Sequence, residues 1–312
     1  MIVQQVLQQL IERRDLTQAE MHAAMMAVMT GEATPAQVGA FLIALRFKGE
    51  TVTEITAAAQ VMRELSSKVS LSVKRKNLVD TCGTGGSGIP LFNISTASAF
   101  VVACAGGFVA KHGNRSVTSK SGSADLLEAA GVNLALAPEQ VAKCVNEIGV
   151  GFMFAVNHHS AMKHAIGPRR DIGVRTIFNV LGPLTNPADA PNQVLGVFDK
   201  NLVRPLAEVL KNLGSEHVLV VHSQDGLDEI SLAAPTFVAE LKNGEISEYS
   251  ITPESLGLKT RPLESLRIDD AKQSLALVKI ALTDNHSAAA DIVALNAGAA
   301  IYAANLCSTL QQ

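Results

Sequence analysis

The chain has 312 residues, of which 47% are hydrophobic and 18% are charged, and its formal net charge is −3. This length and this apolar share predict one large domain with a smaller one, and they argue against disorder. A slightly acidic chain is not typical of a general nucleic-acid binder, although a local basic cluster would suit a phosphorylated small molecule.

The sequence shows no targeting or membrane-spanning pattern. Residues Met1–Arg14 have no apolar signal core, and the longest apolar run, Ala97–Ala110, is too short to span a bilayer. The four cysteines lie far apart, form no CxxC pair and indicate reduced thiols. We therefore expect a soluble, cytoplasmic protein that binds neither a membrane nor nucleic acid.

The first seventy residues predict three or four short helices. Thr17–Glu20 and Thr51–Glu54 are capping boxes, in which a hydroxyl and a carboxylate satisfy the free N–H groups of a first turn. Thr34-Pro35 places a proline at a helix start. We expect a helical lobe over residues 1–72, completed by a helical segment near residues 165–190.

From about residue 77 the pattern predicts strands that alternate with helices. The predicted strands are Leu78–Val79, Gly107–Ala110, Phe152–Ala155, Gln193–Phe198 and His217–Val221. The predicted helices are Ile94–Ala105, Ser123–Ala130, Pro138–Ile148, Val203–Leu213 and Ser287–Leu306, and Asn243-Gly244 predicts a hairpin turn. This alternation predicts an α/β domain over residues 73–312, with a central mixed, mostly parallel sheet covered by helices.

A glycine-rich loop over Asp80–Gly88 is the most informative segment. It follows a predicted strand, and Gly83, Gly85 and Gly88 fit the GxGxxG pattern of dinucleotide-binding proteins. That interpretation fails because Pro90 delays the helix and because no acidic residue follows at the expected distance. A Walker A motif is also absent, which excludes a P-loop nucleotide hydrolase.

The segment between Asp80 and Asp125 contains no acidic residue, but it contains many hydroxyls and several basic side chains. Glycine-turn N–H groups, a helix N-terminus and positive charges all suit phosphate. The basic residues are Lys111, His112, Arg115 and Lys120. On the loop alone, a simple tight turn with solvated charges stays an open alternative.

Several segments in order resemble the anthranilate phosphoribosyltransferase family. They are Gly83–Gly86, Asn93–Thr96, Lys111–Arg115, the serine-rich Ser119–Glu128 and the nearly verbatim Arg175–Pro187. The resemblance covers nearly the whole chain. It implies a fold shared with pyrimidine nucleoside phosphorylases and a homodimer formed through the helical lobe. It also implies transfer of a phosphoribosyl group from phosphoribosyl pyrophosphate to anthranilate in tryptophan biosynthesis, with two Mg²⁺ ions per subunit.

The resemblance further implies site residues. For phosphoribosyl pyrophosphate they are Gly83, Thr84, Gly85, Gly86, Ser87, Asn93, Ser95, Thr96, Lys111, Ser119 and Ser123. For anthranilate they are Gly83, His112, Asn114, His159, Arg169, Gly182 and Pro183, and for the metal they are Ser95, Asp228 and Glu229. No general base is assigned, because an aromatic amine is already a nucleophile at neutral pH.

Some residues depart from the family pattern. Ser87 stands where the family often has Asp, while Val156 and Ser160 replace frequent prolines. Arg169 is preferred to its neighbour Arg170 for the anthranilate carboxylate, since its spacing to other motif residues fits better and a guanidinium binds carboxylate bidentately.

Three other interpretations compete. A pyrimidine nucleoside phosphorylase would lack the acidic pair Asp228-Glu229, and a non-catalytic nucleic-acid-binding relative would be strongly basic with a degraded glycine loop. A zinc site at His158, His159 and His164 is disfavoured, because the chain has no HExxH motif and no cysteine pair.

Overall fold

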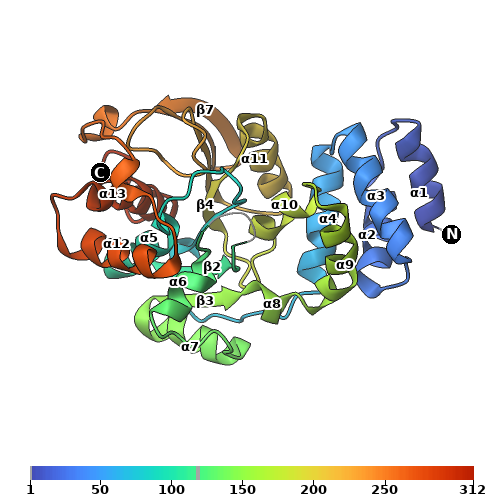
Figure 1. The fold of residues 1–312 in the computed structure, drawn as a ribbon, viewed down its shortest axis with the longest axis horizontal. Coiled ribbons are helices and arrows are strands. Elements are labelled where there is room, and N and C mark those ends of the chain that lie inside the picture. The colour runs from blue at the N-terminus through green and yellow to red at the C-terminus, as the bar shows by residue number, and fades with distance from the viewer. Residues whose placement is uncertain (1, 117–119) are drawn as a thin grey trace.

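Four consecutive helices build the N-terminal lobe in the computed structural model, which describes residues 2–116 and 120–312. The helices are α1 (Ile2–Ile11), α2 (Gln18–Thr30), α3 (Pro35–Lys48) and α4 (Val52–Glu64). Both predicted capping boxes form, at the starts of α2 and α4. A later helix, α9 (Lys163–Ile172), packs against α2 and α3 (Figure 1). The domain boundary at residues 72 and 73 stays a prediction.

A single sheet forms the centre of the second part of the chain. Within the described residues it has seven strands in the order β3-β2-β1-β4-β5-β6-β7, with β1 to β5 parallel and β6 and β7 antiparallel. The strands are β1 (Leu78–Gly83), β2 (Phe108–Gly113), β3 (Val150–Phe154), β4 (Asn192–Gly196), β5 (His217–Ser223), β6 (Thr236–Lys242) and β7 (Glu245–Ile251). The predicted α/β fold with a mixed, mostly parallel sheet is confirmed.

Helices cover both faces of this sheet. One face packs against α5 (Ile94–Cys104) and α13 (Ala288–Ala303), and the other packs against α7 (Pro138–Ile148) and α11 (Val203–Asn212). The remaining helices are α6 (Ser123–Ala129), α8 (Ala155–His158), α10 (Phe178–Leu181) and α12 (Ala271–Thr283). No helix of the described chain is long and apolar enough to cross a membrane.

Helix α12 was not predicted from the sequence, and several predicted ends differ from the observed ones by a few residues. Asp270 caps α12 by accepting from the Gln273 backbone N–H, at 2.8 Å, so an N-cap signal was present but overlooked. The closing helix begins at Ala288 after the Ser287 cap and ends at Ala303, three residues before the predicted end. The third strand starts at Val150 rather than Phe152.

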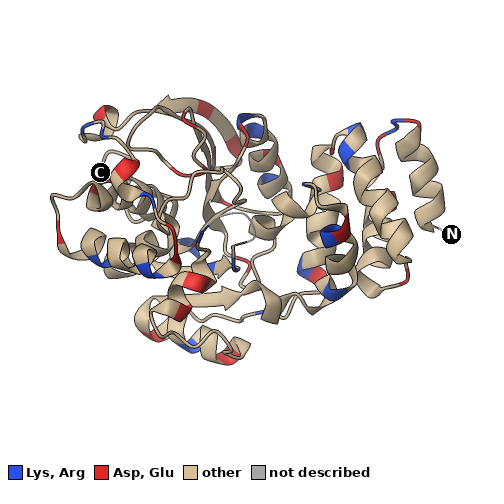
Figure 2. Ribbon diagram, viewed as in Figure 1, with Lys and Arg blue, Asp and Glu red and all other residues tan. Residues whose placement is uncertain are grey.

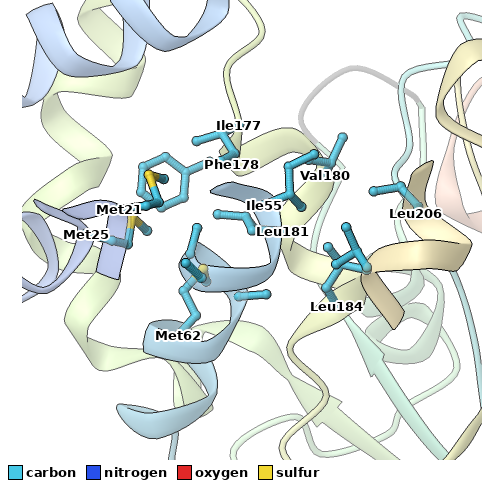
Figure 3. Packing of buried hydrophobic residues seen from close by; sticks show 14 of the residues in the cluster. Met21, Met25, Ile55, Met62, Ile177, Phe178, Val180, Leu181, Leu184 and Leu206 are labelled. Atoms are coloured by element: carbon cyan, nitrogen blue, oxygen red, sulfur yellow. The ribbon is translucent and has the colours of Figure 1, made fainter. Parts of the chain in front are cut away.

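The helical lobe and the sheet share one buried core. Phe178 of α10 points toward the methionines of α2, while Leu184 and Leu206 extend the same cluster toward α11 (Figure 3). Burial of apolar surface is the dominant favourable term in packing of this kind. The lobe is therefore held against the α/β domain by a continuous apolar contact.

The strand order places a topological switch between β1 and β4. The chain leaves β1 toward β2 on one side and leaves β4 toward β5 on the other. Their carboxyl ends lie together, with Gly83 paired to Gly196. In open α/β sheets, ligands bind outside the carboxyl ends of the strands at such a point.

A buried polar network joins the antiparallel edge of the sheet to α13. The Glu240 carboxylate accepts from Tyr302 (2.7 Å) and Tyr249 (2.8 Å), and it lies 3.1 Å from the His217 ring. Burial alone would raise the pKa of Glu240, but the bonds from His217, Tyr302 and Tyr249 outweigh it and lower the pKa to about 2. The ionised carboxylate therefore stabilises this edge.

We expect Glu240→Gln to lower the free energy of unfolding at pH 7 by about 2 kcal/mol, because hydrogen bonds to a charged group are lost. The folded-state pKa is depressed below the ordinary value of 4.5, so the stabilisation is present above pH 4.5 and is lost as the pH falls toward 2. Urea unfolding of the variant and the wild type across this range measures both effects. Glu248→Gln, which changes an exposed partner of Arg204, is the control. An equal loss of unfolding free energy in both variants would contradict the stabilising role of the Glu240 carboxylate.

Candidate active site

Two facing glycines make room for the predicted acidic pair at the topological switch. A Cβ on Gly196 would overlap the backbone oxygen of Asp228, and a Cβ on Gly83 would lie 3.2 Å from Asp228 Oδ2. Only a bare Cα at Gly196 therefore allows the loop after β5 to come this close to β4. The close approach brings Asp228 and Glu229 to the end of β1.

Ser87 and Ser95 lie beside the two carboxylates. Burial raises the pKa of both acids, although the polar groups of Ser87 and Gly85 near Asp228, and those of Ser95 near Glu229, oppose the rise. The neighbouring Asp228 raises the pKa of Glu229 further, to about 8, while Lys111 opposes the shift. The structure thus brings the three predicted metal residues together, with the two carboxylates so close that ionisation of one disfavours ionisation of the other.

Lys111 points into the protein rather than toward solvent. Its ammonium donates to the Thr81 carbonyl and to Ser95 Oγ (3.1 Å), and the residue is 3% exposed. Burial lowers the pKa of Lys111, while Asp80, Cys82 and Glu229 oppose this. Two of its three N–H donors are therefore engaged, and Ser95 links it directly to the acidic pair.

The glycine-rich loop follows directly after β1. Gly85, Gly86 and Gly88 have φ of 65°, 84° and 77°, a left-handed conformation that side chains rarely adopt. Thr84 anchors the loop, because its N–H donates to Gly196 O (2.8 Å) and its hydroxyl accepts from the Phe198 N–H (3.1 Å). The predicted phosphate loop is thereby attached to β4.

The other predicted phosphate-binding residues surround the start of α5. Asn93 precedes the helix, and Ser95 and Thr96 lie in its first turn. The Thr96 hydroxyl is buried without a hydrogen-bond partner in the described part of the chain. Ser123 begins α6 and donates to the Asn114 carbonyl at 3.3 Å, whereas Ser119 lies outside the described residues.

Two buried histidines lie side by side next to Gly182. The His112 and His159 rings are 5.0 Å apart, and His112 Nδ1 lies 3.2 Å from the Gly182 carbonyl. Neither Nε2 atom has a hydrogen-bond partner among residues 2–116 and 120–312. Burial, and then neighbouring histidines, lower the pKa of His112 well below its ordinary value and that of His159 to about 4. Both rings are therefore neutral at neutral pH.

The two neighbouring arginines of α9 differ in their surroundings. Arg169 is partly buried, with its guanidinium carbon 5.0 Å from the Phe178 ring centroid, and it forms no ion pair with any described residue. The Arg170 side chain is 82% exposed and lies 4.0 Å from Asp171. Burial lowers the pKa of Arg169. Of the two, Arg169 is thus the arginine whose planar fork is available to a carboxylate.

Asn114 and Pro183 complete the predicted set. Asn114 is exposed, and its Oδ1 accepts from the Arg115 N–H at 2.7 Å, which leaves its amide N–H groups for a ligand. Pro183 is buried, and its carbonyl accepts from Gln193 at 2.7 Å. The Pro183 carbonyl is therefore already engaged within the protein, and a role of Pro183 in anthranilate binding stays a prediction.

Two residues near the site were missed by the sequence analysis. Arg175 donates to the Gly86 carbonyl and stacks 4.1 Å from the Phe198 ring centroid, so it reaches the glycine loop from the segment after α9. Asn296 of α13 exchanges hydrogen bonds with the backbone of Ile230, at 2.9 and 3.0 Å, next to the acidic pair. Arg175 begins the Arg175–Pro187 motif, but nothing in the sequence pairs Asn296 with Ile230.

Zinc binding finds no support in the described residues. They contain no group of three or more His, Cys, Asp or Glu side chains that could hold a metal. His158 instead lies 2.8 Å from the Ser67 carbonyl. Two surface hollows, one beside Arg63 and Lys68 and one beside Lys200 and Phe237, include none of the predicted site residues.

Two family models together match most of the chain. The model of the glycosyl transferase family helical bundle domain matches residues 4–66, and that of the glycosyl transferase family a/b domain matches residues 75–312. The chain therefore belongs to the glycosyl transferase family and contains both of these domains.

Individual relatives narrow the class. Anthranilate phosphoribosyltransferases from Marinomonas sp. (strain MWYL1) and Ectopseudomonas mendocina (strain ymp) are 64% and 62% identical, over 100% of this chain and 90% of each relative. The chain belongs to the anthranilate phosphoribosyltransferase family.

Solved structures agree with this assignment. The crystal structure of the enzyme from Thermus thermophilus has a TM-score of 0.91 and 43% identity, covering 98% of this chain and 91% of that one. The enzyme from Saccharomyces cerevisiae in complex with PRPP and Mg has a TM-score of 0.87 and 25% identity, covering 99% and 90%. The relatives support neither a nucleoside phosphorylase nor a nucleic-acid-binding protein.

Proposed function

We propose that the protein transfers the 5-phosphoribosyl group of phosphoribosyl pyrophosphate to the amine of anthranilate in tryptophan biosynthesis. The products are N-(5-phosphoribosyl)anthranilate and pyrophosphate. The observation that supports the proposal is that the carboxyl end of β1 combines a left-handed glycine loop with a buried acidic pair. Helix α9 adds Arg169, which has no ion-pair partner among the described residues. The relatives named above support the choice of substrates.

The glycine loop and the start of α5 bind the diphosphate donor. Backbone N–H groups of Gly83 to Gly86 and the free first turn of α5 suit phosphate oxygens. The buried Thr96 hydroxyl adds a donor, and Lys111 contributes positive charge from beneath the loop. Arg175, which donates to the Gly86 carbonyl, adds a second positive charge beside the loop.

Ser95, Asp228 and Glu229 hold Mg²⁺. Two crowded carboxylates and a hydroxyl are the oxygen donors this cation takes, and one or two carboxylates with substrate phosphates make a usual magnesium site. When bound, the cation neutralises charge on the departing pyrophosphate. The protein's part is to keep both carboxylates facing the glycine loop. The number of two ions per subunit stays a prediction.

The acceptor site is built around Arg169, His112 and His159. The planar guanidinium of Arg169 binds the anthranilate carboxylate bidentately. Because both imidazoles are neutral and their Nε2 atoms bond to no described residue, they offer lone pairs to the N–H groups of the amine. Positioning of the amine against the ribose carbon then supplies much of the rate enhancement.

Anthranilate fluorescence tests the reaction directly. In the presence of the protein, phosphoribosyl pyrophosphate and Mg²⁺, we expect the fluorescence of anthranilate to fall as the amine is ribosylated. Chelation of the metal should stop the reaction, and added Mg²⁺ should restore it, because the carboxylates need the cation to hold the diphosphate. No loss of fluorescence with folded protein and all reactants present would contradict the proposed function.

Arg169→Ala separates the two substrate sites. We expect the KM for anthranilate to rise by roughly tenfold to a hundredfold, because a charge-assisted bond to the carboxylate is lost. The KM for phosphoribosyl pyrophosphate should change little. Arg170→Ala, one residue along the same helix but exposed, is the matched control and should leave both constants close to wild type. Equal damage to both substrates in Arg169→Ala would refute the assignment.

A homodimer through the helical lobe is also part of the proposal. Three large apolar side chains of α1 and α3 are solvent-exposed: Ile11, Ile43 and Phe47, with Phe47 78% exposed. Helix α1 carries no charged residue, and it lies at the outer edge of the lobe (Figure 2). An uncharged outer helix beside a few exposed apolar side chains supports self-association. The cytoplasmic location expected from the sequence stays a prediction.

A further inference from the structure

The side chain of Asn93 lies between two segments that are far from it in the sequence. On one side is Ser121, which precedes α6, and on the other is Ser274 of α12. Although Asn93 occupies the N-cap position of α5, its side chain makes no capping bond to that helix. The side chain of a predicted diphosphate-binding residue is therefore directed by tertiary contacts and not by its own helix.

Ser274 forms a closed pair of hydrogen bonds with Asn93. Its hydroxyl accepts from the Asn93 backbone N–H at 3.0 Å and donates to Asn93 Oδ1 at 2.7 Å. Ser274 is fully buried, with no exposed surface. A hydroxyl has one donor, so this geometry uses that donor for Asn93 alone.

Ser121 forms a second pair of bonds with the same amide. The Ser121 hydroxyl donates to Asn93 Oδ1 at 2.8 Å, and Asn93 Nδ2 donates to the Ser121 carbonyl at 3.1 Å. The carbonyl fixes the orientation of the amide, because only the Nδ2 group can face it. Both acceptor positions of Oδ1 and one N–H of Nδ2 are then occupied, and the other N–H has no partner among residues 2–116 and 120–312.

We propose that Ser274 is a positioning residue for phosphoribosyl pyrophosphate binding, acting through Asn93 on the serine-rich segment around Ser121. The inference rests on the proposed function and extends it to α12, which carries none of the predicted site residues. Without the Ser274 hydroxyl, Asn93 loses a partner at its backbone and another at Oδ1. Its amide is then held by Ser121 alone, so the position of Asn93 and Ser121 relative to α12 is less firmly fixed.

The test is Ser274→Ala compared with Ser98→Ala. Ser98 is also a buried serine of this region, in α5, but its hydroxyl donates only to the Ile94 carbonyl of its own helix at 2.9 Å. We expect Ser274→Ala to raise the KM and the Kd for phosphoribosyl pyrophosphate by roughly three- to tenfold, as loss of a hydrogen bond implies, with little change in the KM for anthranilate. Ser98→Ala should keep all three constants and change only stability.

A double variant shows whether the effect passes through Asn93. If it does, Asn93→Ala with Ser274→Ala is no worse for diphosphate binding than Asn93→Ala alone. Additive losses of phosphoribosyl pyrophosphate affinity in the double variant would overturn the inference. Equal KM and Kd values for the donor in Ser274→Ala and Ser98→Ala would also overturn it. In either case, activity of the wild type would still support the proposed function. Titration calorimetry with phosphoribosyl pyrophosphate and Mg²⁺ gives Kd without relying on turnover. A wild-type protein that binds the donor but does not ribosylate anthranilate would count against the proposed function only.

Discussion

The site depends on one steric constraint, the contact between the Asp228 backbone and the bare Cα of Gly196. Any side chain at Gly196 would occupy the position of the Asp228 backbone carbonyl. Gly83, on the neighbouring strand, lies close to the Asp228 side-chain carboxylate. Because both glycines end parallel strands at the topological switch, the loop after β5 can lie across them. This contact places two carboxylates beside the glycine-rich loop, as the proposed site for magnesium and diphosphate needs.

The supports of this arrangement come from helices far away in the chain. Asn296 of α13 holds the backbone beside the acidic pair, and Ser274 of α12 holds Asn93 at the start of α5. On the acceptor side, Arg169 is set by the packing of α9 on the helical lobe and by its contact with Phe178. The continuous apolar core shared by the lobe and the sheet therefore positions the arginine relative to the phosphate loop.

Much of the fold and of the site could be predicted, because the signals are local. The capping boxes at Thr17 and Thr51 and the left-handed glycines after β1 act within a few residues. The contacts of Gly196, Ser274 and Asn296 could not be predicted, since each joins segments that only the folded chain brings together. The sequence also does not reveal that Lys111 points inward, a consequence of the neighbouring Thr81 carbonyl and Ser95 hydroxyl.

The most direct measurement is the affinity for phosphoribosyl pyrophosphate, by calorimetry with and without Mg²⁺, in wild type, Gly196→Ala and Asp228→Asn. The wild type should bind more tightly when Mg²⁺ is present. In the presence of Mg²⁺, both variants should bind phosphoribosyl pyrophosphate roughly tenfold to a hundredfold more weakly than the wild type. Gly196→Ala displaces the carboxylate, and Asp228→Asn removes its charge. Asp228→Asn keeps the shape of the side chain, so it answers the question even if Gly196→Ala folds poorly. Binding with an unchanged response to Mg²⁺ in Asp228→Asn would contradict the account.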